Sequence, residues 1–409
     1  MHVICILYTC VLVYLSTYPM ELMLKNAHNI TEELIEWRRD FHMHPETGFD
    51  THRTSAKVAD ELEKMGYRVT RGVGKTGVVA EIGEGSPVVA IRADMDALPL
   101  LEANQTDYAS QIPGKMHACG HDSHTSMALG AAHLLTKEKF NGRVRFLFQP
   151  AEEVADDEGK SGAMRMAEDG CMKDVDYVIA QHVDPHAPAG TIGVSSGPAS
   201  AGVDSWFAEI RGIGGHGAHP EKTVDPFVLA AHVIIALNSI VSRRVDPFAP
   251  AVVSIGSLNG GFTENVIPES VKITGTLRYT NLDLHKELRA EIQRAFEVAR
   301  TLGGDYNLKF EYGGPPMIND ANVSVAIEAV GVDLLGRENI HEIHKTMGAE
   351  DFGAFLEHAP GAMFTLGTGG RPETEFPLHH PHFDIDERAL PIGTALLVET
   401  ALRFLKRNA

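Results

Sequence analysis

Short apolar runs alternate with longer amphipathic stretches over the first half of the chain. Thr31 is suited to cap the first amphipathic stretch, and Gly66 is suited to end the second. The pattern predicts helices from residue 31 and over 54–65, 124–135 and 162–168, and strands over 77–82, 88–92, 144–148 and 177–181. Strands that alternate with helices predict an α/β fold, with a mostly parallel central sheet flanked by helices.

The pattern changes near Gly202, where residues 204–211 alternate like a half-buried strand. The residues that follow predict a helix over 226–241, strands over 251–258 and 270–280, a helix over 283–302 and a strand over 308–312. This is a self-contained α+β unit of antiparallel strands and two helices. After the Gly-Pro stretch 313–316, helices and strands alternate again. We therefore predict a catalytic domain in two parts, 23–201 and 313–409, interrupted by a smaller domain over 202–312.

The first 22 residues are predicted to be a leader or an extension. Residues 3–15 form an apolar run that is too short to span a membrane and lacks the basic flank of a signal peptide. A secretion signal, a frayed or buried extension, and a start site assigned too early all fit it. Met20 and Met23, just before the first strong helix, favour the last. We expect no stable membrane insertion.

Cysteine usage and charge narrow the location and the partners. The 4 cysteines are too few for a disulfide scaffold and fit a reducing compartment, which predicts the cytoplasm, with secretion as the alternative. The formal net charge of −19 argues against nucleic acid as a partner, because phosphate binding needs a basic surface. A small anionic substrate stays possible, since an arginine or a metal ion can reverse the local field.

Residues 116–124 hold one thiol and three imidazoles within nine positions, before a predicted helix. Thiolate and imidazole are preferred ligands of zinc and similar divalent ions, and Cys119 and His121 are close enough in sequence to share a site. The helix N-terminus is expected to lower the pKa of Cys119 and favour its thiolate. A helix cap carrying surface histidines is the plain alternative.

Other candidate ligands follow predicted strands, and the carboxyl ends of strands form the usual ligand-binding edge of an α/β sheet. Glu152 and Glu153 follow the strand 144–148, so one can bind a metal ion while the other takes a proton from water. His182 follows the strand 177–181. The plain alternatives are glutamates that face solvent and a structural histidine. Three late histidines can supply one more ligand, although the pattern does not say which: His379, His380 and His382.

Metal-dependent hydrolysis fits these segments better than the other common chemistries. The chain has no Gly-Xaa-Ser-Xaa-Gly nucleophile motif and no phosphate-binding Gly-Lys-Ser/Thr loop. Asp94 and Asp96 follow another strand and are expected to support the ligands from behind.

The motifs RADMDALP, MHACGHD, QPAEE, GGHGAHP, NVIP, GTLR and GAEDF occur in this order, after an early RRDFHMHPE and before the late histidines. They resemble the di-metal aminoacylase and carboxypeptidase family, in the branch of hippurate hydrolases, N-acyl-amino-acid amidohydrolases and plant auxin-conjugate hydrolases. The resemblance covers about residues 30 to 405.

The resemblance implies two divalent ions per chain, with zinc expected and manganese, cobalt or nickel as alternatives. Cys119 would bridge the ions, with His121 and His182 completing one position and Glu153 and His379 the other. Glu152 would be the general base. The remaining histidines are expected to be structural or to support the ligands: His117, His124, His219, His380 and His382.

The resemblance also makes the inserted domain a lid and dimerisation domain. His216 would stabilise the oxyanion in a partner subunit, and Asn265 and Arg278 would bind the substrate carboxylate. The plain alternatives are a turn-stabilising His216 and a surface Arg278. The expected reaction is hydrolysis of N-acyl-L-amino acids in a homodimer or dimer-based oligomer; a carboxypeptidase or dipeptidase acting on short peptides and a non-catalytic metal- or ligand-binding protein are the alternatives.

The sequence departs from the family pattern at two places. Residues 154–160 form a longer and more acidic stretch than usual, which is expected to reshape the pocket rim, and Glu221 stands where the branch often has histidine.

Overall fold

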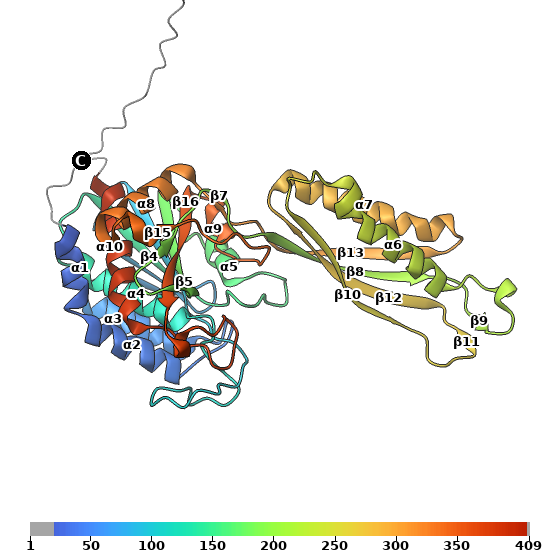
Figure 1. Ribbon diagram of the computed structural model, residues 1–409, viewed down its shortest axis with the longest axis horizontal. Helices are drawn as coiled ribbons and strands as arrows, with labels where there is room; N and C mark the ends of the chain where they lie inside the picture. The colour runs from blue at the N-terminus through green and yellow to red at the C-terminus, as the bar shows by residue number, and fades with distance from the viewer. Residues whose placement is uncertain (1–19, 407–409) are drawn as a thin grey trace, which may run out of the picture.

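Two separate units lie along the longest axis of the computed structural model, which describes residues 20–406 (Figure 1). The larger unit is built from both ends of the chain around an eight-stranded sheet, and the smaller unit carries a four-stranded sheet and two helices. The apolar run 3–15 and its two cysteines lie outside the described residues. Helix α1 (Met20–His28) begins within the expected leader segment and buries Met23 and Ala27.

The large sheet has a parallel centre and mixed edges. Its order is β1-β2-β4-β3-β5-β16-β6-β15, in which β4, β3, β5 and β16 run parallel. The first two strands join the sheet antiparallel. The strands are β1 (Arg68–Val73), β2 (Gly77–Glu84), β3 (Val88–Asp94), β4 (Gly142–Gln149), β5 (Tyr177–Pro188), β6 (Ile192–Gly193), β15 (Ile340–His341) and β16 (Gly361–Gly369).

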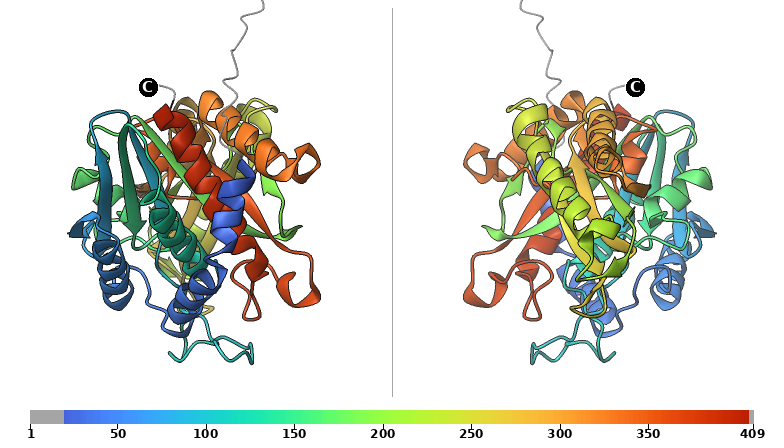
Figure 2. Two further views of the ribbon diagram at one scale, coloured as in Figure 1. Left: turned by 90° about the vertical axis from the view of Figure 1, so that its left-hand side faces the viewer. Right: turned by 90° about the vertical axis from the view of Figure 1, so that its right-hand side faces the viewer.

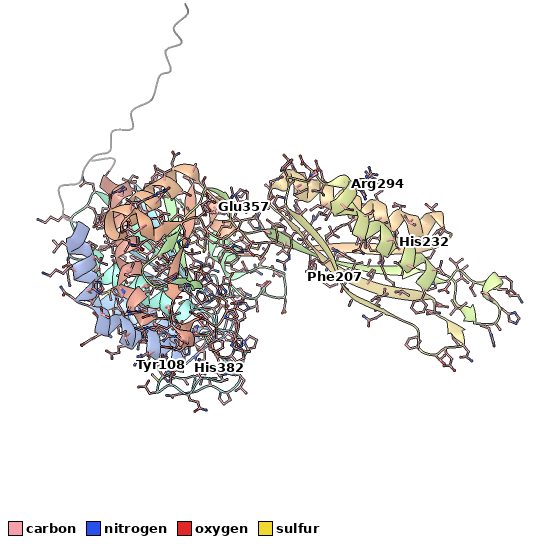
Figure 3. The ribbon with its side chains drawn as sticks, viewed as in Figure 1. Tyr108, Phe207, His232, Arg294, Glu357 and His382 are labelled. Carbon is pink, nitrogen blue, oxygen red and sulfur yellow. The ribbon has the colours of Figure 1, made fainter. Side chains whose placement is uncertain are left out.

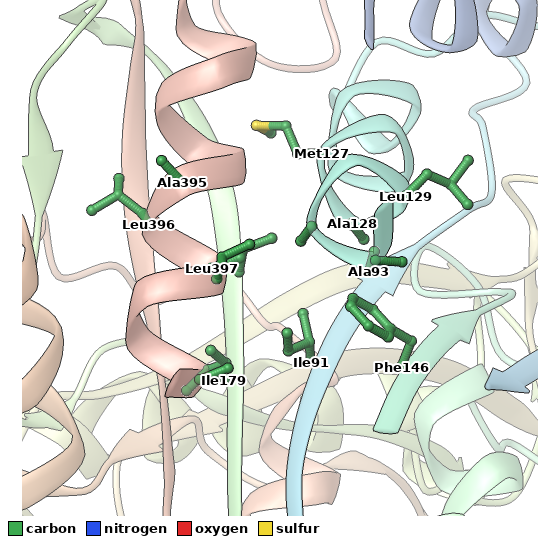
Figure 4. Packing of buried hydrophobic residues seen from close by; sticks show 14 of the residues in the cluster. Ile91, Ala93, Met127, Ala128, Leu129, Phe146, Ile179, Ala395, Leu396 and Leu397 are labelled. Carbon is green, nitrogen blue, oxygen red and sulfur yellow. The ribbon is translucent and has the colours of Figure 1, made fainter. Parts of the chain in front are cut away.

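Helices cover both faces of this sheet, which explains why its central strands are apolar on both sides. Every residue of β3 is buried, with Ile91 facing one hydrophobic cluster and Ala90 the other. Figure 4 shows Ile91 and Phe146 under helices α4 and α10. One face is covered by α1, α2 (Thr31–Met43), α3 (His52–Lys64), α4 (His121–Leu135), α8 (Ala321–Leu335) and α10 (Leu390–Lys406), and the other by α5 (Gly162–Glu168) and α9 (Gly353–Leu356).

The smaller unit has a hydrophobic core of its own. Its antiparallel sheet has the order β10-β12-β8-β13, and one face packs under α6 and α7 around the fully buried Trp206. Phe207, next to Trp206 in β8, lies on the face of the sheet that the helices do not cover (Figure 3). His232 of α6 lies on the helix side. The elements are β8 (Gly202–Arg211), α6 (Pro226–Arg244), β10 (Ala251–Gly260), β12 (Ser270–Tyr279), α7 (Leu282–Thr301) and β13 (Asp305–Gly314).

Short elements complete the chain. They are β7 (Gly197–Pro198), β9 (Gly215–His216), β11 (Val266–Ile267), β14 (Ile318–Asn319) and four 3-10 turns, at Pro220–Lys222, Arg337–Asn339, Pro372–Thr374 and Glu387–Ala389. Among the described residues, α6 is the one helix long and apolar enough to cross a membrane, and 33% of that stretch is buried. A helix in the core of a soluble protein can be equally long and apolar. Helix α6 packs on its sheet in this way, through Leu229 and Val233.

The predicted fold class is confirmed, and most predicted strands and helices lie within a few residues of the observed ones. Thr31 as a helix cap was wrong: Ile30 occupies the cap position, and the Thr31 hydroxyl donates to the carbonyl of His28 at the end of α1. The domain boundaries 202 and 312 stay predictions; β8 begins at Gly202 and β13 continues to Gly314.

Candidate metal centre

The predicted ligands gather at the carboxyl edge of the parallel strands, as the strand positions predicted. Cys119 and His121 lie at the start of α4, which begins at His121 rather than at His124. Glu152 and Glu153 follow β4. His182 lies inside β5, because this strand runs on to Pro188 instead of ending at residue 181.

The ligand atoms form two groups that share one sulfur. In the first group, which we call position 1, donor atoms of Cys119, His121 and His182 all lie within 4.8 Å of one another. In the second, position 2, the same holds within 4.8 Å for Cys119, Glu153 and His379. The Cys119 Sγ lies 3.5 Å from His182 Nε2, and His379 Nε2 lies 3.2 Å from Glu153 Oε1. His379, and neither His380 nor His382, is thus the late histidine that reaches this cluster.

The two imidazoles of position 1 have the tautomer that a metal ligand needs. The Nδ1 of His121 donates to the carbonyl of Asp96 at 2.7 Å, and the Nδ1 of His182 donates to the carbonyl of Val183 at 2.8 Å. Because a carbonyl only accepts, the proton of each neutral ring lies on Nδ1, which leaves Nε2 free to bind a cation. Among the described residues, the buried Nε2 of His121 has no hydrogen-bond partner. This set of thiol, imidazole and carboxylate donors therefore fits a pair of divalent cations.

Cys119 differs from the prediction in its acidity. Burial raises the pKa of its thiol well above the ordinary value, rather than the helix N-terminus lowering it. A divalent cation bound beside Cys119 would favour its thiolate. Gly120, at φ +84°, makes the turn into α4 possible, since a Cβ there would lie 2.3 Å from Val183 Cγ2.

Asp96 fixes both the glutamate pair and His121. Its Oδ1 and Oδ2 accept the backbone N–H groups of Glu152 at 2.9 Å and Glu153 at 3.2 Å. Its own carbonyl accepts from His121. Ala151, which precedes Glu152, has a φ of 49°, a strained backbone conformation. The hydrogen bonds from Glu152 and Glu153 to Asp96 hold this conformation in place. The supporting role of Asp96 stays a prediction.

Replacing Asp96 with alanine is expected to weaken metal binding about 10–100-fold, because the turn that presents Glu153 loses both bonds. A competition titration with a chromophoric chelator measures the affinity. Asp320→Ala is the matched control, since Asp320 also accepts two backbone N–H groups, those of Asn322 and Val323 at the start of α8. Equal affinities for both variants would contradict the role given to Asp96.

Asp94 acts through a neighbouring histidine. It accepts from His124 Nδ1 at 2.6 Å and from Arg92 Nη1 at 2.6 Å. Although complete burial opposes it, the charge of the Arg92 guanidinium, together with His121 and the hydrogen bond from His124, lowers the pKa of Asp94 well below its usual range. The Nε2 of His124 accepts the N–H of Val183, so both ring nitrogens of His124 are engaged. Its supporting role stays a prediction.

Glu152 lies in a nest of carboxylates that the sequence did not reveal. Carboxylate oxygens of Glu152, Glu350 and Asp351 lie within 4.8 Å of one another. Burial raises the pKa of Glu152 well above its usual value, and the charges of Glu350 and Asp351 raise it further. A carboxylate with a raised pKa holds a proton more readily, which suits a residue that takes a proton and returns it.

The buried Arg92 organises this nest. Its guanidinium reaches Gln149, Asp94, Glu350 and Asp351 at 2.6–3.2 Å. Burial raises the pKa of Asp351 to about 7 despite Arg92. The sequence predicts a supporting role for Asp94 but assigns none to Arg92 or Glu350, which lie in the RADMDALP and GAEDF motifs.

A cavity of about 450 Å³ opens beside the cluster. Its polar lining includes Cys119, Glu152 and Glu153, and its apolar lining includes Val154, Met317, Ile343, Met363 and Leu378. In the acidic stretch 154–160, Val154 lines this cavity, while Asp156 turns away to Lys75 and Arg165. The stretch thus adds two apolar residues, Val154 and Ala155, to the cavity lining.

The predicted lid residues are not brought to the cluster. His216 is exposed in β9, which pairs with β11 next to the exposed Asn265, at the end of the small unit far from the large one (Figure 1). Arg278 lies nearer, where its Nη1 donates to the carbonyl of Met347 at 2.9 Å. His219 is exposed and lies 3.6 Å from Glu221. Within one chain, the metal ligands and His216 are separate.

Behind α4, a buried charged cluster surrounds His42. Its ring contacts Asp122 at 2.8 Å and Glu102 at 3.2 Å. Although burial acts the other way, these carboxylates raise the pKa of His42 to about 9. His117, fully buried nearby, has no hydrogen-bond partner on either ring nitrogen among the described residues, and burial lowers its pKa to about 3.

The stability of the protein is expected to fall as the pH rises towards 9. A folded pKa above the ordinary 6.5 means that the contribution of His42 is full below pH 6.5 and is lost as the pH passes about 9. The shift corresponds to about 3 kcal/mol. Urea unfolding at pH 6.5 and 9.5 measures this loss, with His42→Gln as the reference. An equal pH dependence in both proteins would rule the effect out.

The mostly parallel sheet with its inserted antiparallel unit (Figures 1 and 2) and the paired donor groups at the strand ends are typical of a metal-dependent hydrolase. The chain belongs to Peptidase family M20/M25/M40, whose model matches residues 90–403. The resemblance that the motifs predicted is thereby confirmed.

Individual relatives match over nearly the whole chain. N-acetyl-L-cysteine deacetylase of Bacillus subtilis is 38% identical and covers 94% of this chain and 91% of its own. The IAA-amino acid hydrolase ILR1-like 4 of Arabidopsis thaliana is 37% identical, covering 96% and 90%. The crystal structure of a dinuclear metal binding peptidase of the M20 family from Bacillus subtilis superposes with a TM-score of 0.81 at 34% identity, covering 93% and 99%.

Proposed function

We propose that the protein hydrolyses the amide bond of N-acyl-L-amino acids, releasing a carboxylic acid and a free amino acid. The observation that carries this proposal is the pair of donor groups sharing Cys119, with Glu152 beside them. The deacetylase and the IAA-amino acid hydrolase, both similar over nearly the full length, are named for such substrates and support it.

The residues have distinct roles in this proposal. Cys119, His121 and His182 would hold one divalent ion, and Cys119, Glu153 and His379 would hold the other. When bound, the two ions supply a lowered pKa for water and polarisation of the substrate carbonyl. Glu152 takes a proton from the attacking water and returns it to the leaving amine. Its raised proton affinity suits both steps.

The substrate carboxylate is assigned to Arg278 and Asn265, and the oxyanion to His216 of a second subunit. Arginine suits the carboxylate because its planar fork can donate two parallel bonds. We further propose a homodimer formed through the lid, residues 202–312, because His216 and Asn265 lie far from the cluster of their own chain.

Zinc is the proposed native metal, since Cys, His and Glu together are a common zinc set, with manganese, cobalt or nickel as substitutes. The cytoplasm is the proposed location, in keeping with the free thiols of Cys119 and Cys171. Insertion into a membrane is not part of the proposal, because one face of α6 packs on the lid sheet.

A substrate panel tests the proposed function. Metal-reconstituted protein is assayed for amino-acid release from N-acetyl and N-benzoyl amino acids, from dipeptides, and from the same acyl compounds with an amidated carboxyl group. We expect N-acyl amino acids to react fastest, and the amidated controls and chelator-treated protein to react poorly.

Faster cleavage of dipeptides would favour the carboxypeptidase or dipeptidase alternative. The similar structure described as an M20 peptidase supports this alternative. Metal binding without any turnover would favour the non-catalytic alternative.

A further inference from the structure

A single buried arginine joins the two segments that supply different metal positions. Arg38 in α2 is 0% exposed. Its Nε donates to Asp122 at 2.9 Å, its Nη2 to Asp384 at 2.7 Å and its Nη1 to Glu387 at 3.2 Å. All three acceptors are carboxylates, so the guanidinium is the cation at the centre of an anionic shell.

These carboxylates stand close to the ligands in the chain. Asp122 directly follows His121 at the start of α4, and Asp384 and Glu387 lie on the segment that follows His379. That segment is strained at its ligand, since His379 has φ 65°. The backbone N–H of His379 donates to the carbonyl of Ala118 at 2.8 Å, so the segment lies directly against the residues just before Cys119.

Each side keeps local partners of its own. Asp122 also accepts from His42, Asp384 from the Tyr108 hydroxyl at 2.6 Å, and Glu387 from Arg39 at 2.7 Å. None of these partners connects α4 to the segment after His379 by itself. Without the Arg38 guanidinium, the buried Asp122 and the partly buried Asp384 and Glu387 would face one another, and their repulsion would push the segment away from α4.

We propose that Arg38 is a positioning residue. It holds the segment after His379 next to α4 and thereby sets the affinity of position 2 for its ion. The inference rests on the ligand set of the proposed function. Position 1 depends on it less, because His121 is oriented by Asp96 and His182 by its own strand.

The test is a zinc titration of the full-length apo-protein, followed by chelator competition and native mass spectrometry. Wild type is expected to bind two ions. Arg38→Met is expected to keep one ion at near wild-type affinity and to bind the second about 10–100-fold more weakly. Adding His379→Ala to Arg38→Met should lower the affinity for the second ion only a little further, whereas adding His182→Ala should abolish binding of the remaining ion.

Two further variants separate positioning from general stability. Leu34→Ala lies on the same helix and is equally buried, but touches none of the carboxylates, so it should lower the melting temperature while leaving the ratio of the two affinities unchanged. Asp384→Asn removes the carboxylate charge that Arg38 contacts on the segment after His379, and it should also weaken binding of the second ion. This variant keeps the test usable if Arg38→Met does not fold.

The outcomes are distinct. Two ions bound at wild-type affinities in both Arg38→Met and Asp384→Asn would overturn the inference alone, and so would an equal loss at both positions that Leu34→Ala reproduces. Fewer than two ions in the wild type would overturn the proposed function, and this inference with it.

Discussion

Replacing Glu152 with glutamine is expected to lower kcat about 10²–10⁴-fold while both ions stay bound. The amide has the size of the carboxyl group but cannot take a proton from water or return one to the amine. Glu152 belongs to neither of the two groups that share Cys119, so the donor sets of both positions stay complete. Steady-state kinetics with an N-acyl amino acid, together with metal analysis of the same preparation, measure both parts of the prediction.

Glu350→Gln is the matched control, because Glu350 lies in the same nest of carboxylates and undergoes the same chemical change. Its effect should be much smaller. Glu153→Gln should instead lose metal, since Glu153 is a proposed ligand. Turnover of the Glu152 variant close to wild type, or an equal loss in Glu350→Gln, would refute the role of Glu152 as the base.

The metal cluster could be predicted because its signals are local. Cys119 and His121 are two positions apart, Glu152 and Glu153 are adjacent, and apolar strands precede the glutamate pair. The parallel sheet then brings these segments to one edge. The choice of His379 among the late histidines, and the division of roles between Glu152 and Glu153, came from the resemblance to the family. The position of His182 inside β5, rather than beyond it, changes nothing, since its side chain still faces this edge.

The supporting charges could not be predicted in the same way. Arg92 meets Glu350 across 258 positions, and Arg38 meets Glu387 across 349. In the sequence, each looks like an ordinary surface charge. Only the fold reveals that both guanidinium groups are fully buried and surrounded by carboxylates.

Errors at the ends of helices have a related cause. Helix α4 begins at His121, where His121, Asp122 and Ser123 are polar and yet buried. A pattern that assigns polar residues to the surface places the start later. The polar side chains are tolerated because Asp96, Arg38 and His42 supply their hydrogen bonds. Strands β6 and β15, with two residues each, are too short to show any alternation.

His216→Ala is expected to lower kcat about 10²–10³-fold, as the loss of one oxyanion donor does in other hydrolases. The exposed position of His216 at the far end of the lid makes a second prediction possible, because a residue that acts in a partner can be supplied by a different chain. Protein that carries His216→Ala has an intact base, and protein that carries Glu152→Gln has an intact lid.

Mixing these two inactive proteins under conditions that exchange subunits should restore activity. In a mixed dimer, the lid of the Glu152→Gln chain would complete the site of the His216→Ala chain, giving one working site. Random exchange makes half of the dimers mixed, so activity should reach about a quarter of the wild-type value. The same mixture without exchange is the control. No recovery despite demonstrated exchange would mean that His216 serves its own subunit, which would require the lid to bring β9 to the cluster of its own chain.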